Sequence, residues 1–473
     1  MQAGEVADEV AARQPDNLAA RNLQAVVATH QGDRQSGRRI LEEILAKNPT
    51  YRPARINLVK LDIIEGNYTA ADEVLTDLLS ADPDDQLALR ESAEVAAARG
   101  DRRTAIQRLE RIRQINPRAA RPILELASLY LSENRPGDAL KVAQALEREV
   151  PDNLMVKKGL AMVQLLRDEL PLAQSLLEDA ARLAGRDVEE LTAVAKLQVR
   201  AGALEAAEAN FRKALEQQPD SVAARLELAA LLTFQHRYDH AASEIDLVLS
   251  KEPDSLTAIA QLGDIRLAQG RAGEAIDLYR RAQTRSEQPE LMVKLHRALV
   301  RAGRAEQALE ELQAWNEVRP DSPSVMLVLA DRLQQKGDNE AALSLYLRLA
   351  DLQPQSAIVH NNLANLLMPV DAERALAAAM RAHELAPDNA AVLDTLGWVL
   401  VQLGDLERGL IHLREAVIRN SRSPTLRYHL AVALEEYGNK TEARRALRRA
   451  LAMKAPFQER EQARARLERL QIR

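Results

Sequence analysis

The apolar positions of the chain repeat about every 34 residues. Thirteen blocks fall into register when they start at residues 18, 52, 86, 120, 154, 188, 222, 256, 289, 323, 357, 390 and 424. Leucine fills the seventh position of ten blocks, and alanine or glycine fills the eighth position of eleven. The twentieth position is small in all thirteen once the block at 357 is given a one-residue deletion, and large residues such as Phe211 and Tyr279 fill the twenty-fourth. Small residues let two helices approach closely while large ones fill the space beside them, so each block predicts a packed helix pair.

Proline and glycine mark where these helices end. Ten of the 19 prolines share one phase of the repeat, and nine of the 18 glycines lie 17 residues after it. Proline ends a helix and glycine turns the chain, so each block reads as helix A, a glycine turn, helix B and a proline loop. The loops often continue as Pro-Asp-Asn or Pro-Asp-Ser, whose side-chain oxygens can cap the next helix.

A helix pair with this pattern resembles the tetratricopeptide repeat (TPR) family. The shared features are Leu-Ala or Leu-Gly at positions 7 and 8, Ala at 20 and Pro at 32. The segments HNNLANLL (360–367) and LDTLGWVL (393–400) are most similar to helix A of that family. The resemblance covers about 440 residues. It implies an all-α fold, a right-handed α-solenoid of tandem helix-turn-helix units.

The repeat divides the chain into three parts. Residues 1–17 fit the second half of a truncated unit, residues 18–455 hold thirteen tandem units, and residues 456–473 form a polar capping helix. Ala3, Ala7 and Val10 occupy helix B columns of the first part. Terminal repeats are usually polar caps, so a bare half unit predicts that this chain is a fragment, with more repeats and a signal sequence upstream.

Composition removes several classes of function. The chain has no cysteine, which excludes disulfides and thiolate metal sites. A net charge of −6 on 473 residues gives no global basic field, so we expect no nucleic acid partner. The first residues lack the basic and apolar segments of a signal peptide, and no apolar run is long enough to span a membrane.

No residue pattern points to catalysis. The chain lacks the metalloprotease His-Glu-x-x-His motif, the phosphate-binding Gly-x-x-x-x-Gly-Lys loop and the Gly-x-Ser-x-Gly nucleophile elbow. His236 and His240 have a spacing that can bind a metal, but they flank a turn without a nearby third ligand. His296 occupies a small eighth position, where we expect a local rearrangement and a hydrogen-bonded imidazole. We therefore predict a protein that is not an enzyme, has no cofactor or metal, and acts by binding.

One patch stands out among the groove positions. In proteins of the family that the chain resembles, positions 2, 5, 6, 9, 12 and 13 of helix A line a concave groove. Three neighbouring blocks place polar and aromatic side chains there, and the candidate ligand-binding residues are Asn361, Asn362, Asn365, Asp394, Thr395, Trp398, Tyr428 and His429. Tryptophan and tyrosine combine a large apolar area with one polar group, as binding anchors do. The patch predicts binding of a peptide or a sugar chain; the alternative is that these side chains only pack on one another.

The last two blocks add a second resemblance. They are similar to the C-terminal end of long bacterial TPR proteins of the PEP-CTERM/exosortase system, through Asp394, Thr395, Leu396, Gly397, Trp398, Tyr428, His429, Leu430 and Ala431. That resemblance implies a lipoprotein scaffold of Gram-negative bacteria in the periplasm or at the outer membrane. It also implies a role in exopolysaccharide export or surface-protein sorting, with partners from a secretion or export machinery and with exopolysaccharide as a further ligand. The alternative is a cytoplasmic adaptor that regulates a partner enzyme.

Charge is uneven at the C-terminal end. Residues 440–473 hold eleven Lys or Arg and four Asp or Glu. An excess of this kind can contact an anionic surface, such as membrane headgroups or an acidic polysaccharide. The alternative is an arginine-rich helix surface facing solvent.

Overall fold

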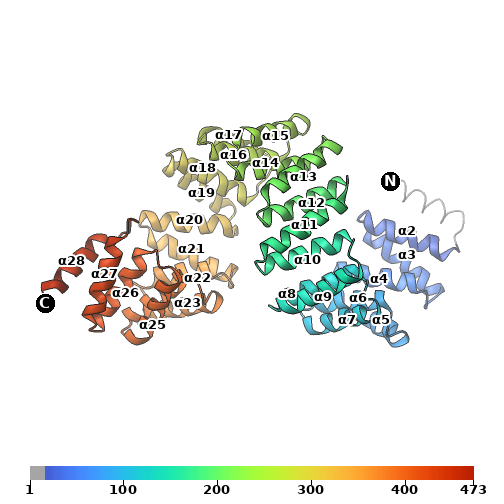
Figure 1. Ribbon diagram of the computed structural model, residues 1–473, viewed down its shortest axis with the longest axis horizontal. Coiled ribbons are helices and arrows are strands. Elements are labelled where there is room, and N and C mark those ends of the chain that lie inside the picture. The colour runs from blue at the N-terminus through green and yellow to red at the C-terminus, as the bar shows by residue number, and fades with distance from the viewer. Residues whose placement is uncertain (1–15, 473) are drawn as a thin grey trace. The chain divides into compact units, whose positions relative to one another are not determined.

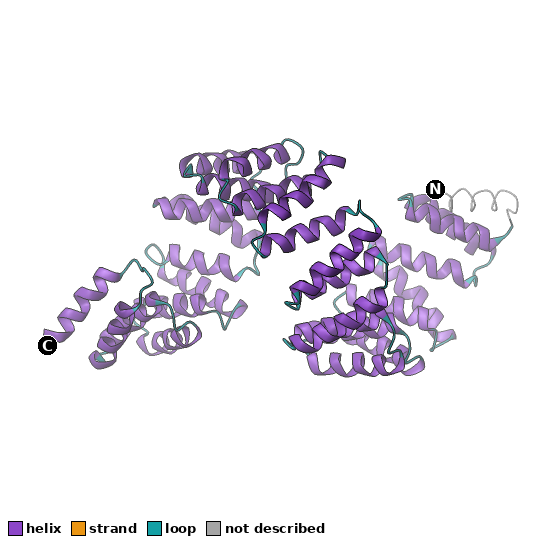
Figure 2. Cartoon of the chain, turned by 45° about the horizontal axis from the view of Figure 1, so that its top comes forward, coloured by secondary structure: helices purple, strands orange, loops and turns teal. Residues whose placement is uncertain are grey.

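The computed structural model describes residues 16–472, with the side chains of residues 16–471. These residues form helices joined by loops, and none of them lies in a strand (Figure 2). The half unit predicted for residues 1–14 lies outside the described part. No described helix has the length and apolar character needed to cross a bilayer. The all-α class predicted from the repeat is confirmed.

The chain forms two compact units, Met1–Glu244 and Ile245–Arg473, and the boundary falls within α15 (Tyr238–Lys251). Each unit is a stack of consecutive helix pairs (Figure 1). The helices of unit 1 are α2 (Leu18–His30), α3 (Arg34–Lys47), α4 (Arg52–Glu65), α5 (Tyr68–Ala81), α6 (Gln86–Ala98), α7 (Arg102–Ile115), α8 (Ala120–Ser132), α9 (Pro136–Glu149), α10 (Leu154–Leu166), α11 (Leu170–Ala184), α12 (Val188–Arg200), α13 (Leu204–Gln217) and α14 (Val222–Phe234).

Unit 2 continues the same alternation, in which even-numbered helices are helix A of their block and odd-numbered ones are helix B. Its helices are α16 (Leu256–Ala268), α17 (Ala272–Gln283), α18 (Pro289–Arg301), α19 (Ala305–Val318), α20 (Pro323–Lys336), α21 (Asn339–Leu352), α22 (Ala357–Leu367), α23 (Ala372–Leu385), α24 (Ala390–Gln402), α25 (Leu406–Arg419), α26 (Pro424–Glu436), α27 (Lys440–Ala452) and α28 (Arg460–Ile472). The last helix, α28, starts four residues after the predicted start of the capping helix at 456. It packs on the end of the unit through Ala463 and Leu470.

Small residues lie where helices A and B of one block meet. A Cβ atom added to Gly397 on α24 would lie 2.8 Å from Cγ of Leu413 and 3.0 Å from the carbonyl oxygen of Gly409, both on α25. A Cβ atom on Gly263 would meet the ring of Tyr279, which fills the twenty-fourth position of its block, at 2.5 Å. There is no room for either methyl group, so the close helix approach predicted from the small columns is confirmed.

The turn between helices A and B uses a left-handed residue. The nine turn glycines have φ between +73° and +92°, a conformation that costs glycine little. Among the described residues, only Asn134, Asp168 and His236 have positive φ without being glycine, at 55°, 59° and 60°. Each of them stands at the turn position of a block that lacks the glycine. Asn, Asp and His adopt positive φ more readily than most other residues, so the left-handed turn is kept in blocks where glycine is absent.

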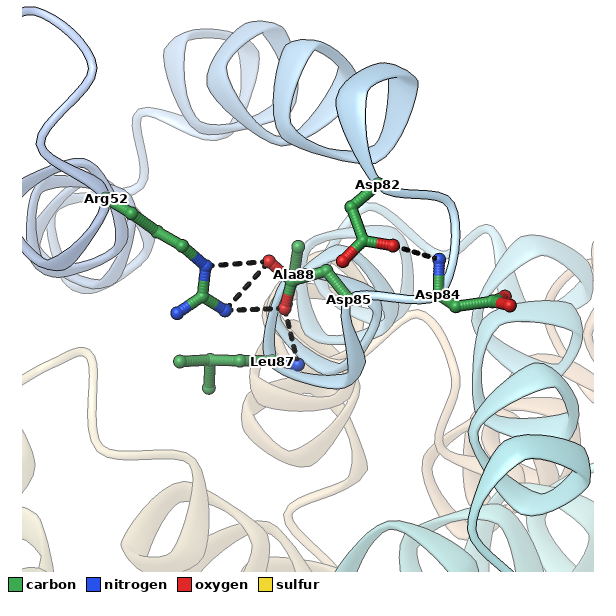
Figure 3. A network of polar contacts seen from close by, with 6 residues as sticks. All are labelled: Arg52, Asp82, Asp84, Asp85, Leu87 and Ala88. Carbon is green, nitrogen blue, oxygen red and sulfur yellow. Dashed lines mark hydrogen bonds and ion pairs between the residues drawn. The ribbon is translucent and has the colours of Figure 1, made fainter.

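Polar caps link consecutive blocks, as the junction of α4 and α6 illustrates (Figure 3). Asp85 caps α6 by accepting hydrogen bonds from the backbone N–H of Leu87 (3.0 Å) and Ala88 (3.1 Å). Arg52, the first residue of α4, donates from Nε to Oδ2 of Asp85 (2.9 Å) and from Nη2 to Oδ1 (2.6 Å). Burial acts to raise the pKa of Asp85, but the bonds from Arg52 and the two amides outweigh it and lower the pKa overall. The capping role predicted for loop Asp, Asn and Ser is confirmed here.

Candidate functional site

The helix A face of unit 2 holds two neighbouring regions that could bind a ligand. The basic groove lies between α18, α20 and α22 and is bordered by Arg297, Arg301 and Arg332. The amide–aromatic patch is the set of eight candidates predicted on α22, α24 and α26: Asn361, Asn362, Asn365, Asp394, Thr395, Trp398, Tyr428 and His429. Asn362 belongs to both regions, which therefore adjoin on α22.

The basic groove is a hollow of about 510 Å³ with an aliphatic lining. Its apolar wall is made by Val293, Val300, Leu327, Val328 and Ile358. Ile358 is 61% exposed, so most of the apolar surface of this side chain is open to solvent at the groove. A hollow of this volume with an apolar wall and a few polar groups is typical of sites that bind ligands.

Three arginines surround this aliphatic wall. Arg297 and Arg301 are exposed on α18, four residues apart, and neither forms an ion pair with a described residue. Like charges at this spacing repel each other by about 0.2–0.5 kcal/mol, so the pair is not explained by helix stability. Asp331 is the acidic residue that lines the groove; it is exposed and accepts a hydrogen bond from Nε2 of Gln335 at 2.8 Å. Positive charge therefore prevails in the groove.

His296 fixes the orientation of the third arginine. Its side chain is 3% exposed, and its Nε2 lies 3.0 Å from Nε of Arg332. An arginine nitrogen can only donate, so Nε2 accepts and the ring proton resides on Nδ1, which faces the carbonyl oxygen of Ala308 at 3.4 Å. Burial is the main cause that lowers the pKa of His296, and the charge of Arg332 lowers it further. The expected hydrogen-bonded imidazole is confirmed, and it is a neutral acceptor for Arg332.

A phenol and an amide complete the groove. Nδ2 of Asn362 donates to the hydroxyl oxygen of Tyr346 at 2.9 Å. Burial raises the pKa of Tyr346, so its hydroxyl stays protonated at neutral pH. Tyr346 is fully buried, so its bond with Asn362 holds the amide in place at the base of the groove.

The centre of the amide–aromatic patch is held by contacts between α24 and α26. The rings of Trp398 and His429 stack with centroids 4.5 Å apart and planes 26° from parallel. Nδ1 of His429 donates to Asp394, whose Oδ2 lies at 2.8 Å and Oδ1 at 3.0 Å. The hydroxyl of Tyr428 donates to Oε1 of Gln462 on α28 at 3.0 Å. Asp394 and Tyr428 are buried, with 8% and 5% exposure, so their polar groups are used within the fold.

The amides of α22 form the rest of the patch. Nδ2 of Asn361 donates to Oδ1 of Asn362 at 3.3 Å, and Nδ2 of Asn365 donates to the hydroxyl of Thr395 at 3.4 Å. Both distances are long for hydrogen bonds. Among the described residues, nothing contacts the buried Oδ1 of Asn361 as a hydrogen-bond donor. Asn361, Asn365 and the half-buried ring of Trp398 are therefore the parts of the patch still able to meet a ligand, and its binding role stays a prediction.

Unit 1 contains an apolar hollow of about 400 Å³ between α8 and α10. Its wall includes Leu124, Met162 and Leu166 but no charged side chain. A wall of this kind can attract apolar groups, and the polar side chains that line it are only the serines Ser128 and Ser132. The basic groove of unit 2 is therefore the better-defined site.

The basic groove was not predicted from the sequence, although two signals for it exist. His296 breaks the rule of small eighth positions, and Arg297 and Arg301 have no acidic residue three or four positions away on their helix. What the repeat could not reveal is the contact between His296 and Arg332, because these side chains come from different blocks, 36 residues apart.

The described residues form no arrangement for metal binding. Within 16–472 there is no cluster of three His, Asp or Glu side chains that could hold a metal ion. His236, one of the histidines with metal-binding spacing, stands at the left-handed turn position, and its Nδ1 lies 2.7 Å from the hydroxyl of Tyr238. The left-handed turn accounts for the position of His236, and the turn supplies no third metal ligand.

Comparison with known proteins places these units among helical repeats. A family model described as tetratricopeptide repeat matches residues 28–91, 96–163, 198–263 and 266–331, and a second model of the same description matches residues 395–458. The "TPR repeat-containing protein PA4667" of Pseudomonas aeruginosa is 29% identical over 173 residues, which cover 35% of this chain and 29% of that protein. The "BBSome complex member BBS4" of Bos taurus is 26% identical over 228 residues, covering 48% of this chain and 44% of that protein.

A solved structure extends over most of the chain. The crystal structure of the APC/C hetero-tetramer Cut9–Hcn1 contains a chain that is 14% identical and superposes with a TM-score of 0.42, covering 96% of both chains. By contrast, the chain spans less than half the length of the two curated relatives.

Proposed function

The chain belongs to the tetratricopeptide repeat family, and on that premise we propose that it is a non-enzymatic scaffold whose basic groove binds a protein partner. The observation that carries the proposal is a hollow with an exposed aliphatic wall and with arginines that form no ion pair with residues 16–472. A ligand can bind such a surface favourably in two ways. It can bury the exposed apolar area, and it can pair with the unneutralised positive charge. One relative is named as a member of a multiprotein complex, in keeping with a scaffold.

A matched pair of isoleucines tests this site. Ile358 in the groove and Ile411 on α25 are each 61% exposed, so aspartate at either position should leave the fold equally intact. We expect the wild-type chain and Ile411→Asp to retain the same partner in affinity purification from the native host, and Ile358→Asp to lose it. Retention of every partner by Ile358→Asp would show that binding takes place elsewhere, and equal loss in both variants would point to a general effect of charge.

The cellular setting is a finer proposal that rests on the sequence resemblance of the last two blocks alone. We propose that the full-length protein acts in exopolysaccharide export or PEP-CTERM surface-protein sorting, in the periplasm or at the outer membrane, with an export machinery as partner. The alternative is a cytoplasmic adaptor that regulates an enzyme. Fractionation of the native host with an antibody against this chain separates the two, because a wholly cytoplasmic protein contradicts export.

The polysaccharide ligand needs its own test. We propose the amide–aromatic patch as its place, because Trp398 can stack on a sugar ring and the amides of Asn361 and Asn365 can bond its hydroxyls. We expect purified exopolysaccharide of the host to quench the fluorescence of Trp398. This quenching should be absent in Trp398→Phe. Unchanged fluorescence with the polysaccharide present would remove the patch as a sugar site.

A further inference from the structure

We propose that the ligand of the basic groove is an acidic peptide segment that carries an aliphatic side chain. This inference rests on the function proposed above and adds the chemistry of the partner. The aliphatic requirement follows from the wall: Val300, Val328 and Ile358 present branched apolar groups, and Ile358 leaves most of its surface in water until something covers it. Covering that area with an aliphatic side chain is favourable, whereas covering it with a polar group is not.

The acidic requirement follows from the balance of charge. Three guanidinium groups border the groove and one carboxylate, Asp331, lies among them. His296 adds no charge because its imidazole is neutral, as its role as acceptor for Arg332 requires. A carboxylate of the ligand can therefore pair with Arg297 or Arg301 without displacing an existing partner.

Arg332 gives the groove a fixed donor. Its Nε is held by His296, and its Nη1 donates to Oε1 of Gln335 at 2.8 Å. An arginine held at two points loses little further freedom when it binds a carboxylate, so its remaining N–H groups are prepared for a ligand. We assign His296 as a positioning residue that acts through Arg332.

The same features disfavour nucleic acid and lipid. Binding of single-stranded nucleic acid relies on exposed aromatic rings for stacking, whereas the aromatic side chain that lines this groove, Tyr346, is buried with its hydroxyl engaged by Asn362. A membrane would need a broad basic surface, but these arginines surround a recessed aliphatic wall. An extended peptide can place alternate side chains against the wall and the arginines, which fits the observed mixture.

Three labelled peptides test the proposal by fluorescence anisotropy on the whole chain. The first repeats Leu-Glu-Val-Asp, the second replaces its acidic residues by lysine, and the third replaces its aliphatic residues by serine. We expect the first peptide to bind, and the other two to bind at least about tenfold more weakly. Competition by a short single-stranded RNA or by anionic phosphatidylserine vesicles as strong as that of unlabelled first peptide would overturn the assignment to peptide.

A double charge reversal supplies the decisive comparison. Arg297→Glu with Arg301→Glu should reverse the preference, so that the lysine peptide binds better than the acidic one. Arg445→Glu with Arg449→Glu on α27 is the matched control: both arginines are exposed, they have the same four-residue spacing, and the change in net charge is identical. We expect the control to keep the wild-type preference.

The outcomes separate this inference from the function that it rests on. If Ile358→Asp abolishes binding of every peptide but charge reversal changes nothing, the groove is a binding site and its acidic preference is wrong. Equal effects of the two charge reversals, or no binding of the first peptide at its highest soluble concentration, would also overturn the acidic preference. Partner capture with Ile358→Asp and Ile411→Asp tests the proposed function independently.

The His296 role has a separate readout. His296→Ala restores the small residue found at this position in most blocks and leaves Arg297 and Arg301 in place. We expect it to weaken binding of the acidic peptide about threefold to tenfold. His296→Gln can offer a side-chain oxygen to Arg332 and should recover part of the affinity. Equal affinity in wild type and both variants would show that His296 has only a packing role.

Discussion

The basic groove and the amide–aromatic patch share one face of unit 2, but they differ in whether their polar groups are bound within the fold. In the groove, Arg297 and Arg301 have no ion-pair partner among the described residues, and Ile358 stands open to solvent. In the patch, Asp394 binds His429, and the same ring stacks on Trp398. Both regions have residue types suited to binding. The difference teaches that residue types alone can only suggest a binding site. Unused hydrogen-bonding groups and unneutralised charges then show which of its side chains remain available to a ligand.

This contrast predicts that substitutions in the patch act on stability and substitutions in the groove act on affinity. A repeat protein need not unfold as one unit, so local opening free energies from hydrogen exchange are the suitable measure.

Trp398→Ala should have the largest effect. The indole packs between α24 and α26 and stacks on His429, so its loss removes apolar contact and leaves a gap at the helix interface. We expect the local opening free energy of α26 to fall by about 2–4 kcal/mol. Ile358→Ala, in the groove, should change the opening free energy of α22 by less than about 0.5 kcal/mol. A small effect of Trp398→Ala would mean that the indole contributes little to the helix interface, and the contrast would fail.

Asp394→Ala comes next. The carboxylate is buried and is the hydrogen-bond partner of Nδ1 of His429, so its removal leaves a half-buried donor unsatisfied. We expect a loss of about 1–3 kcal/mol in the opening free energy of α24 and α26. Asp331→Ala is the matched control, because that carboxylate is exposed and should contribute within about 0.5 kcal/mol. Equal effects of the two substitutions would contradict the distinction between buried and exposed acids.

These tests probe what the sequence could and could not foresee. The 34-residue repeat was sufficient for the helix pairs, for the close approach at Gly397 and for the left-handed turn at Gly404, because each depends on residues within one block. It did not foresee that Asn134 and Asp168 adopt the turn without glycine, since a pattern of glycines cannot show which other residues accept its geometry.

The site was less accessible to sequence reasoning, for a physical reason. Position within helix A placed Trp398 and His429 on the groove-facing side, but their stacking and the bond from His429 to Asp394 join residues of different blocks. The contact of His296 with Arg332 does the same. Such contacts depend on rotamers and on the exact approach of consecutive blocks, which a periodic pattern does not specify.

Acidification should weaken the groove through His296. Burial lowers the pKa of this imidazole from the ordinary value of 6.5, so the unfolded helix binds a proton at a higher pH than the folded one. The resulting stability is complete above pH 6.5 and is lost as the pH falls towards the lowered pKa. Protonation of Nε2 would also oppose the donor of Arg332; Arg297 and Asp331 are the other charged groups that act on the ring, with opposite signs.

The measurement is hydrogen exchange of α18, corrected for intrinsic rates, at pH values above and below 6.5. We expect the opening free energy of α18 to fall in wild type over this range and to fall less in His296→Ala. His412 on α25, whose pKa burial and the nearby His383 also lower, contributes in both proteins and cancels in the comparison. The same pH dependence with and without His296 would show that other groups are responsible.

Asp331→Asn should have the smallest effect and the opposite sign. Asp331 is the acidic group among the arginines of the groove, so it repels an acidic ligand across solvent-exposed space. Removing its charge should strengthen binding of the Leu-Glu-Val-Asp peptide by about twofold to fivefold, less at high salt, because exposed charges interact weakly and are screened. Asp394→Asn, in the patch, should leave peptide affinity unchanged, because its carboxylate is bound to His429. If Asp331→Asn weakened binding of the peptide instead, Asp331 would accept a hydrogen bond from the ligand. The groove would then prefer a polar peptide to an acidic one.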